Sequence, residues 1–489
     1  MGMSYLASVS HFVPELVAVL TMVCLVFIES SYGRNEKGRS FFYWGAFIGL
    51  IFVLLMLMDG FNDQATAIFT GSMIIDPFST LMKMIMVVGT FFSIYLSKES
   101  KDIYKHLKPE FGIMAVGVLI GGMILASANN LLMVYIGIET LSILSYALAS
   151  FKKNDERSSE AGLKYSLYGG VTSGIMLFGM SHVFGVLGTI QFSGISAGLA
   201  NLSTMQIAIL LPSFLMFFAG IGYKIASVPF HMWSPDVYEG SPLPVTTFFS
   251  IVPKMAGIAV LVRVSMIFFG TTGAMQITWV GVLSVVAALT MTVGNVSAIG
   301  QRSVKRMLAY SSISHAGVMM LGVLVINELG VQSVVFYAVT YMFMTLVAFY
   351  ITTFVSDKYG NDHFDRFRGL AFRYPLMTVI LAMVMFSLAG VPPLSGFVAK
   401  FNIFTALISK KYYTLTIIAG LNSVVSVYYY LKIVRLMIFK EQESNEVIAG
   451  FGTTNQSIII ALAIPVLVLG IFWNKLLILV NGAVLYIAH

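Results

Sequence analysis

The sequence has little charge for its length. Only 10% of its 489 residues are Asp, Glu, Lys or Arg, whereas 58% are hydrophobic and the mean hydropathy is +0.87. Soluble proteins carry about 25% charged residues. A water-soluble globular domain is therefore excluded.

Cysteine and the common redox motifs are also scarce or absent. The single cysteine, Cys24, excludes a disulfide framework and a cysteine metal site. The sequence has no CxxC motif, no GxGxxG before a helix and no phosphate-binding loop, so we expect no redox cofactor bound by this chain. Met1 to Val13 contain no Lys or Arg, and we therefore expect no cleavable signal peptide.

What the sequence has instead is a series of apolar runs of about 20 residues, each long enough to cross a bilayer as a helix. We therefore predict an all-α polytopic membrane protein with about fourteen transmembrane helices. Their expected centres are Thr21, Ile51, Met86, Leu119, Ser142, Gly174, Met216, Ala256, Val286, Ala316, Thr345, Met385, Val425 and Val466.

The net charge of +7 resides mainly in short loops between these runs, which indicates topology rather than nucleic-acid binding. The basic loops follow odd-numbered segments, at 34–39, 98–108, 152–157, 302–306, 358–373 and 432–440. The positive-inside rule puts these loops in the cytoplasm and both termini outside. Lys410 and Lys411 are an exception. The loop after the seventh segment is another, because it carries Asp236 and Glu239 but no Lys or Arg.

A weak internal repeat divides the chain. A segment broken by glycine and proline follows Ala219-Gly220 and contains Lys224, and a similar one follows Ala389-Gly390 and contains Lys400. Each repeat spans about five helices, an odd number, so the two copies are expected to be inverted, a pattern typical of transport pathways. Chance is the alternative, since Gly and Pro are common in membrane helices. The predicted divisions are 1–110 (helices 1–3), 111–270 (first repeat), 271–440 (second repeat) and 441–489 (helix 14).

Ionisable residues inside the apolar runs are the candidate functional groups, because each costs about 2.5–3.5 kcal/mol to insert. Desolvation weakens the hold of a buried lysine on its proton and a nearby carboxylate strengthens it, so such groups can form a proton relay. Glu139 is the expected acid, with Lys164 or Lys224 as its partner. The candidate residues are Glu139, Lys164, Lys224, Lys254, Lys400, His315 and Lys305.

Structural roles are open for most of these residues. Lys164 and Lys254 could anchor at the membrane interface, freed carbonyls could hold Lys400, and His315 could be a packed polar group. Lys305 either sets topology or lies at a channel mouth. We expect Lys83 at the interface, and His231, Trp233 and Tyr238 could form an aromatic belt. With one deep carboxylate expected, a metal-ion path is disfavoured.

Three stretches resemble a known family. The run KIASVPFHMWSPDVYEGSPLPVT starting at Lys224, the run SVKRMLAYSSISHAG at 303–317 and the run AGVPPLSGFVAKF at 389–401 are similar to the antiporter-like subunits of respiratory complex I. Among these, the chain most resembles the subunit N group of bacterial NADH–quinone oxidoreductases. The resemblance covers most of the chain.

The resemblance implies a role for each candidate. Glu139 and Lys224 would form the acid–lysine pair of a first half-channel, with Lys164 beside it. Lys254 would link the two halves, Lys400 would end the second, and His315 and Lys305 would lie along the hydrated axis.

The resemblance also implies the setting. Proton translocation in a bacterial inner membrane would be coupled to quinone reduction elsewhere. FMN, iron–sulfur clusters and quinone would lie in other subunits, with no cofactor in this chain. The partners would be the lipid bilayer and neighbouring membrane-arm subunits, and NADH and quinone would act only through the complex. A subunit of a multisubunit cation/proton antiporter without a redox partner, or a structural scaffold, are the alternatives.

Overall fold

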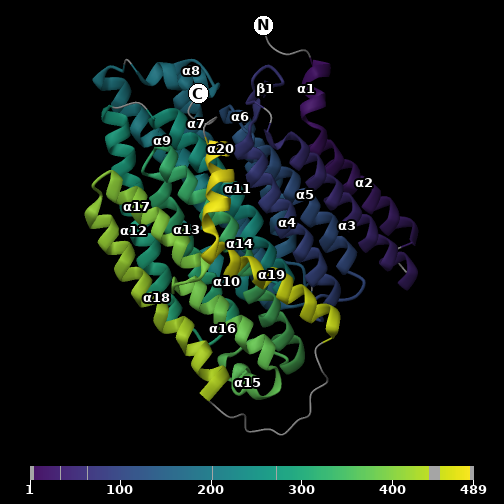
Figure 1. Ribbon diagram of the computed structural model, residues 1–489. Helices are drawn as coiled ribbons and strands as arrows, with labels where there is room; N and C mark the ends of the chain where they lie inside the picture. Colours follow the sequence, from purple (N-terminus) through teal and green to yellow (C-terminus); the bar gives the residue numbers. More distant parts are fainter. Residues whose placement is uncertain are drawn as a thin grey trace.

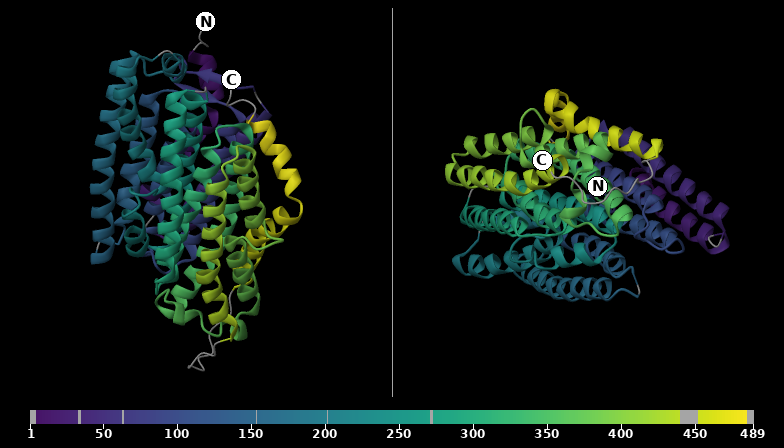
Figure 2. Two further views of the ribbon diagram at one scale, coloured as in Figure 1. Left: turned by 90° about the vertical axis from the view of Figure 1, so that its left-hand side faces the viewer. Right: turned by 90° about the horizontal axis from the view of Figure 1, so that it is seen from below.

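The computed structural model describes residues 5–32, 35–62, 64–152, 154–200, 202–270, 273–439 and 452–484. Within these ranges, long helices lie side by side in one bundle (Figure 1). The end-on view in Figure 2 shows an elongated cross-section, with the first helices (purple) at one end. Arg34, Lys153 and Lys440, which belong to the predicted basic loops, lie outside the described residues.

Twelve helices of the described chain are long and apolar enough to cross a membrane. They are α2 (Val13–Tyr32), α3 (Glu36–Asp59), α4 (Pro77–Glu99), α5 (Lys108–Ala126), α6 (Leu131–Ala149), α7 (Glu156–Leu187), α9 (Thr204–Ile225), α11 (Leu243–Phe269), α12 (Ala274–Ile299), α14 (Glu328–Tyr359), α18 (Tyr413–Phe439) and α19 (Thr453–Ile471). The remaining two predicted segments correspond to α13 (Val304–Val323) and to the shorter apolar helices α16 (Pro375–Ala389) and α17 (Ser395–Ser409). The predicted all-α fold of about fourteen spans is thus confirmed.

Short elements connect or extend these helices. They are α1 (Tyr5–His11), η1 (Gly60–Asn62), the hairpin β1 (Thr66–Ile68) and β2 (Met73–Ile75), α8 (Phe192–Leu199), α10 (Trp233–Gly240), η2 (Phe364–Phe367), α15 (Leu370–Arg373) and α20 (Trp473–Val484). The hairpin is antiparallel, with Thr66 opposite Ile75. In Figure 1 α1 lies at the end of the bundle that carries α8, opposite α15.

The first break in a helix separates α9 from α10. Ala226 adopts a left-handed conformation (φ 58°), and the chain resumes a helix at Trp233. Backbone groups freed inside a membrane must find partners within the protein. Here the Ser227 amide donates to Gly222 O at 2.8 Å, and the Trp233 indole donates to Tyr223 O at 3.0 Å. The indole therefore caps the helix from beyond the break.

The second break separates α16 from α17 and is satisfied by a different donor. Gly390 is left-handed (φ 91°), and Lys400 Nζ donates to Leu388 O at 3.0 Å and to Ala389 O at 2.8 Å. The left-handed backbone favours glycine at this position, and a Cβ here would also lie 2.9 Å from Lys400 Cδ. In Figure 1 α9 lies above α10, whereas α16 lies below α17, so the two broken helices run in opposite directions.

Two buried ion pairs correct the expectation of one deep carboxylate. Lys83 Nζ lies 2.5 Å from Glu15 Oε1, and these side chains are 1% and 0% exposed. Arg263 Nη1 lies 2.9 Å from Asp76 Oδ2, with the same two exposures. The expectation that Lys83 lies at the interface is wrong, because its ammonium is held inside the protein. Glu15 lies in the first turn of α2, at the start of an apolar run, and the sequence does not indicate that Lys83 is its partner.

Breaking the first of these pairs is expected to destabilise the bundle. Glu15→Gln leaves the Lys83 ammonium buried without a carboxylate, and we expect a loss of about 3–5 kcal/mol in the free energy of unfolding. The measurement is denaturant unfolding of the purified chain in detergent micelles. Glu15→Met combined with Lys83→Met should recover most of the loss, because a pair of apolar residues carries no desolvation cost.

The matched control is a surface pair. Arg39 and Glu36 lie 3.5 Å apart with side chains 23% and 87% exposed. Arg39→Gln should change the free energy of unfolding by less than about 1 kcal/mol. A Glu15→Gln protein as stable as the Arg39→Gln protein would show that the buried pair does not stabilise the fold.

Candidate functional site

Lys224 lies in a cage of tyrosine rings at the end of α9. Its side chain is 1% exposed, and Nζ has no hydrogen-bond partner among the described residues. Nζ lies 5.0 Å from the Tyr223 ring centroid, 5.1 Å from that of Tyr165 and 5.4 Å from that of Tyr146. Ring faces attract an ammonium without fixing its direction. The cage thus holds a cation that is free of any fixed hydrogen bond.

Glu139, on α6, is the carboxylate that acts electrostatically on Lys224. Within the described residues it forms no ion pair, and its Oε1 instead accepts a hydrogen bond from Ser173 of α7. Its side chain is partly exposed at the edge of the bundle. The predicted Glu139–Lys224 couple is therefore a through-space interaction here rather than a contact.

Aromatic residues fill the space between Lys224 and Lys254. The Tyr165 and Trp233 rings stack with centroids 4.3 Å apart, and Trp233 meets Tyr238 edge-on at 6.5 Å. Lys254 Nζ lies 5.6 Å from the Tyr238 centroid. Trp233 is 1% and Tyr238 0% exposed. An aromatic belt at the interface is thus excluded for these two residues, because they pack inside the protein around the first break.

Hydroxyl groups of α13 connect to Lys254. Lys254 is 1% exposed, and its Nζ donates to Ser312 Oγ at 2.5 Å. The neighbouring Ser311 hydroxyl bonds Tyr430 OH of α18. The hydroxyl group of each serine can both donate and accept a hydrogen bond, so it can take part in proton transfer. Interface anchoring of Lys254 is excluded by its burial.

His315 and Lys400 line one small polar cavity. The cavity has a volume of about 10 Å³, which is close to the space that one water requires. His315 Nδ1 lies 2.6 Å from Tyr337 OH, and Nε2 lies 3.0 Å from Tyr430 OH. Lys254 and Lys400 are the charged groups that act on the imidazole. The second half therefore holds two polar groups among the described residues: Lys254 with Ser312, and Ser311, Tyr430 and His315 beside the cavity of Lys400.

Lys164 lies in an ion network at the end of the bundle that carries α15. Its Nζ lies 2.6 Å from Asp236 Oδ2 and 2.7 Å from Glu160 Oε1. Asp236 Oδ1 in turn lies 3.1 Å from Arg306 Nη2, and Arg306 also pairs with Glu239. Lys164 is thus not a contact partner of Glu139. The network also explains why the loop after the seventh segment lacks basic residues, because its acids pair with bases from α7 and α13.

Lys305 is buried in the same region. It is 7% exposed, and its Nζ donates to the carbonyls of Ser241 and Glu239, the latter at 3.2 Å. A purely topological role would leave this side chain in water. The burial of Lys305 argues against a purely topological role, and its position at a channel mouth stays a prediction.

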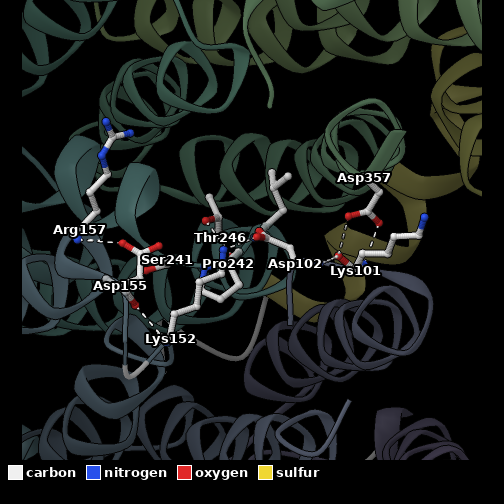
Figure 3. A network of polar contacts seen from close by, with 12 residues as sticks. Lys101, Asp102, Lys152, Asp155, Arg157, Ser241, Pro242, Thr246 and Asp357 are labelled. Atoms are coloured by element: carbon white, nitrogen blue, oxygen red, sulfur yellow. Dashed lines mark hydrogen bonds and ion pairs between the residues drawn. The ribbon is translucent and has the colours of Figure 1, made fainter. Parts of the chain in front are cut away.

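Asp102 ties the loop after α4 to the start of α11. Figure 3 shows its carboxylate between Lys152 and the Pro242 turn, where it accepts a hydrogen bond from the Leu243 amide at 2.7 Å. Burial raises the pKa of this carboxyl group, but Lys305 and Lys152 outweigh burial and hold the pKa below its usual range. Nearby, Asp357 accepts from the Lys101 amide at 3.0 Å.

Some residues of this arrangement were not predicted. Tyr146, Tyr238, Tyr430 and Ser312 contact the buried bases directly. The only sequence signal for them is spacing, since Ser311, Ser312 and His315 occupy one face of a helix at i, i+1 and i+4. Tyrosine is common in membrane proteins, and the sequence alone does not distinguish these rings from packing residues.

The fold and the site define a class of protein: a multi-pass helical membrane protein with two oppositely directed broken helices and buried bases in both halves. The family described as NADH:quinone oxidoreductase/Mrp antiporter, TM matches residues 128–426. A relative from Sorangium cellulosum (strain So ce56), NADH-quinone oxidoreductase subunit N 2, is 38% identical and covers 96% of this chain and 96% of its own. The chain belongs to the NADH:quinone oxidoreductase/Mrp antiporter transmembrane family, among the relatives named subunit N.

Solved structures share the fold. A chain of respiratory complex I from Thermus thermophilus with bound aureothin has a TM-score of 0.81 and 27% identity, covering 96% of this chain and 100% of that chain. A chain of the Mrp complex from Dietzia sp. DQ12-45-1b has a TM-score of 0.85 and 19% identity over 98% of this chain and 97% of that chain. The latter likeness shows the fold alone.

The low pKa of Asp102 predicts an acid-sensitive link. Because the folded pKa lies below the unfolded value of about 3.9, the contribution of Asp102 to stability is complete above that value and is lost as the pH falls through the folded pKa. Asp102→Asn should therefore lower the stability at pH 7 and flatten its fall below about pH 4. Thermal unfolding in detergent at a series of pH values measures both effects. If the stability of Asp102→Asn fell below about pH 4 as steeply as that of the unaltered chain, Asp102 would not be the source of this pH dependence.

Proposed function

We propose that this chain is a membrane-arm subunit of an NADH–quinone oxidoreductase that translocates protons across the membrane, coupled to quinone reduction in other subunits. One observation carries the proposal. Lys224, Lys254 and Lys400 are each buried, and none has an ion-pair partner among the described residues. A permanent structural ammonium at such depth would need a carboxylate.

Each base has a distinct task in this proposal. Lys224 loads a proton inside its ring cage, and its affinity for the proton depends on where Glu139 lies. Lys254 passes a proton between the halves through Ser312. His315 and the polar cavity hand it to Lys400, which releases it outside. Lys305 and Lys164 stand beside the cytoplasmic approach. Buried ionisable groups in series are the usual form of a membrane proton relay.

The space between Lys224 and Lys254 imposes a condition on this relay. The Tyr165–Trp233 stack leaves no chain of hydrogen bonds joining the two lysines among the described residues. A proton passes only when these rings separate and water enters. In this conformation the relay is therefore interrupted at the first break, and movement of α10 is the step that would open it.

The proposal extends to the setting of the chain. The orientation puts the basic loops in the cytoplasm and both termini outside a bacterial inner membrane. Neighbouring membrane-arm subunits and the bilayer are the partners, and FMN, iron–sulfur clusters and quinone belong to other subunits. A cation/proton antiporter without a redox partner is the alternative. The 38% identity to a relative named NADH-quinone oxidoreductase subunit N 2 favours the oxidoreductase.

The relay is tested in the assembled complex. Lys224→Met should slow quinone reduction coupled to proton translocation by about tenfold or more, since a proton-transfer group contributes at least that much. Lys224→Arg keeps the positive charge, but a guanidinium group does not release its proton. This variant should therefore be slowed to a similar extent. The measurement is the rate of quinone reduction together with the rate of proton uptake in inverted membrane vesicles.

Lys410→Gln is the matched control, since Lys410 is an exposed lysine beyond the end of α17. It should retain full coupling. Assembly of each variant is checked by co-purification of the complex. A fully assembled Lys224→Met complex with undiminished proton translocation would exclude Lys224 from the relay.

A further inference from the structure

A pocket far from the buried bases lies between the N-terminal helices and α19. It has a volume of about 360 Å³, in the range typical of small-ligand sites. Its lining is mostly aromatic and comes from α3, α4 and α19, with one cation: Ser40, Tyr43, Trp44, Phe47, Phe91, Phe92, Tyr95, Lys98 and Ile458.

The polar groups of this pocket gather at one end. Lys98 lies in the last turn of α4, and its Nζ is 5.9 Å from the ring centroids of both Tyr43 and Tyr95. Tyr43 is 4% exposed. Its hydroxyl has no hydrogen-bond partner of good geometry among the described residues, and the nearest polar side chain that acts on it is Ser97. A buried hydroxyl of this kind requires an acceptor.

The charges around that end are of both signs, and Glu99 acts on Tyr43 and Tyr95 as well as on Lys108. Lys108 Nζ donates to the Lys98 carbonyl at 2.7 Å, and Lys105 and Arg39 are near enough to act on Lys108. The opposing carboxylates are Glu99 and Asp357, and Arg39 also pairs with Glu36. Basic groups at the end of a spanning helix attract anionic headgroups.

The apolar end continues along the bundle. Trp44 is 64% exposed on the outer face of α3, and the Phe47 and Phe91 rings lie 4.8 Å apart below it. At the α19 side, Tyr95 donates to Asn455 at 3.3 Å and Ile458 closes the wall. A ligand here must therefore combine a long apolar body with an anionic head that accepts hydrogen bonds.

We propose that this pocket binds an anionic phospholipid. The phosphate meets Lys98 and accepts from the Tyr43 hydroxyl, and one acyl chain lies against Trp44, Phe47 and Phe91. The lipid joins α3 and α4 to α19, helices from opposite ends of the sequence. This site is independent of the proton relay, since it shares no residue with it.

Tryptophan quenching tests the proposal with the full-length chain in lipid nanodiscs. Brominated phosphatidylglycerol and brominated phosphatidylcholine are compared at equal content, and Trp44 is the reporter. We expect phosphatidylglycerol to quench several-fold more strongly. Lys98→Gln should reduce the ratio to about one, and Tyr43→Phe should reduce it in part. Trp44→Phe should remove the difference, which establishes its origin.

Lys410→Gln is the control, because this lysine lies at the other end of the bundle, and it should leave the ratio unchanged. Circular dichroism confirms that each variant is folded. Equal quenching by the two lipids in the unaltered chain, or an unchanged ratio in Lys98→Gln, would overturn the proposal and leave only a general lipid annulus. A ratio that falls equally in Lys410→Gln would do the same.

Discussion

The constraint on which this structure depends is the cost of keeping an ammonium group inside hydrocarbon. The chain meets it in three ways: with a carboxylate for Lys83, with backbone carbonyls for Lys400 and with ring faces for Lys224. The carboxylate fixes a charge permanently. Carbonyls and rings stabilise the cation less strongly, and they remain satisfactory neighbours when the lysine is neutral. The choice of partner therefore separates structural bases from mobile ones.

The two broken helices satisfy their free carbonyl groups with different hydrogen-bond donors. Each helix stops where the chain turns left-handed, and each leaves carbonyls that need donors. In α9 the donor is the indole of Trp233, so Lys224 is left unbonded. In α16 the donor is Lys400 itself. The halves are thus related in architecture and unlike in chemistry, and the same geometry places one lysine in a cage and the other on a helix end.

Much of this could be read from the sequence, for physical reasons. Apolar runs of membrane length predict spans directly, and the Gly390 and Pro393 region predicts a break because proline cannot donate and glycine can turn. The depth of Lys224 followed from its place in those runs, whereas for Lys254 the sequence left anchoring at the membrane interface open. The ion-pair partners of the buried and half-buried residues did not follow from the sequence. Lys164 was expected beside Glu139 and instead pairs with Asp236, because pairing depends on how α7 and α10 pack, which periodicity does not encode.

Asp236 is bonded on one side to a base from α7 and on the other to a base from α13. One carboxylate cannot strengthen both contacts at once. By thermodynamic linkage, any coupling between these two contacts is reciprocal: loss of Lys164 changes the Arg306 contact by as much as loss of Arg306 changes the Lys164 contact. Asp236 is therefore a point where a helix of the first half and a helix of the second half share one charge.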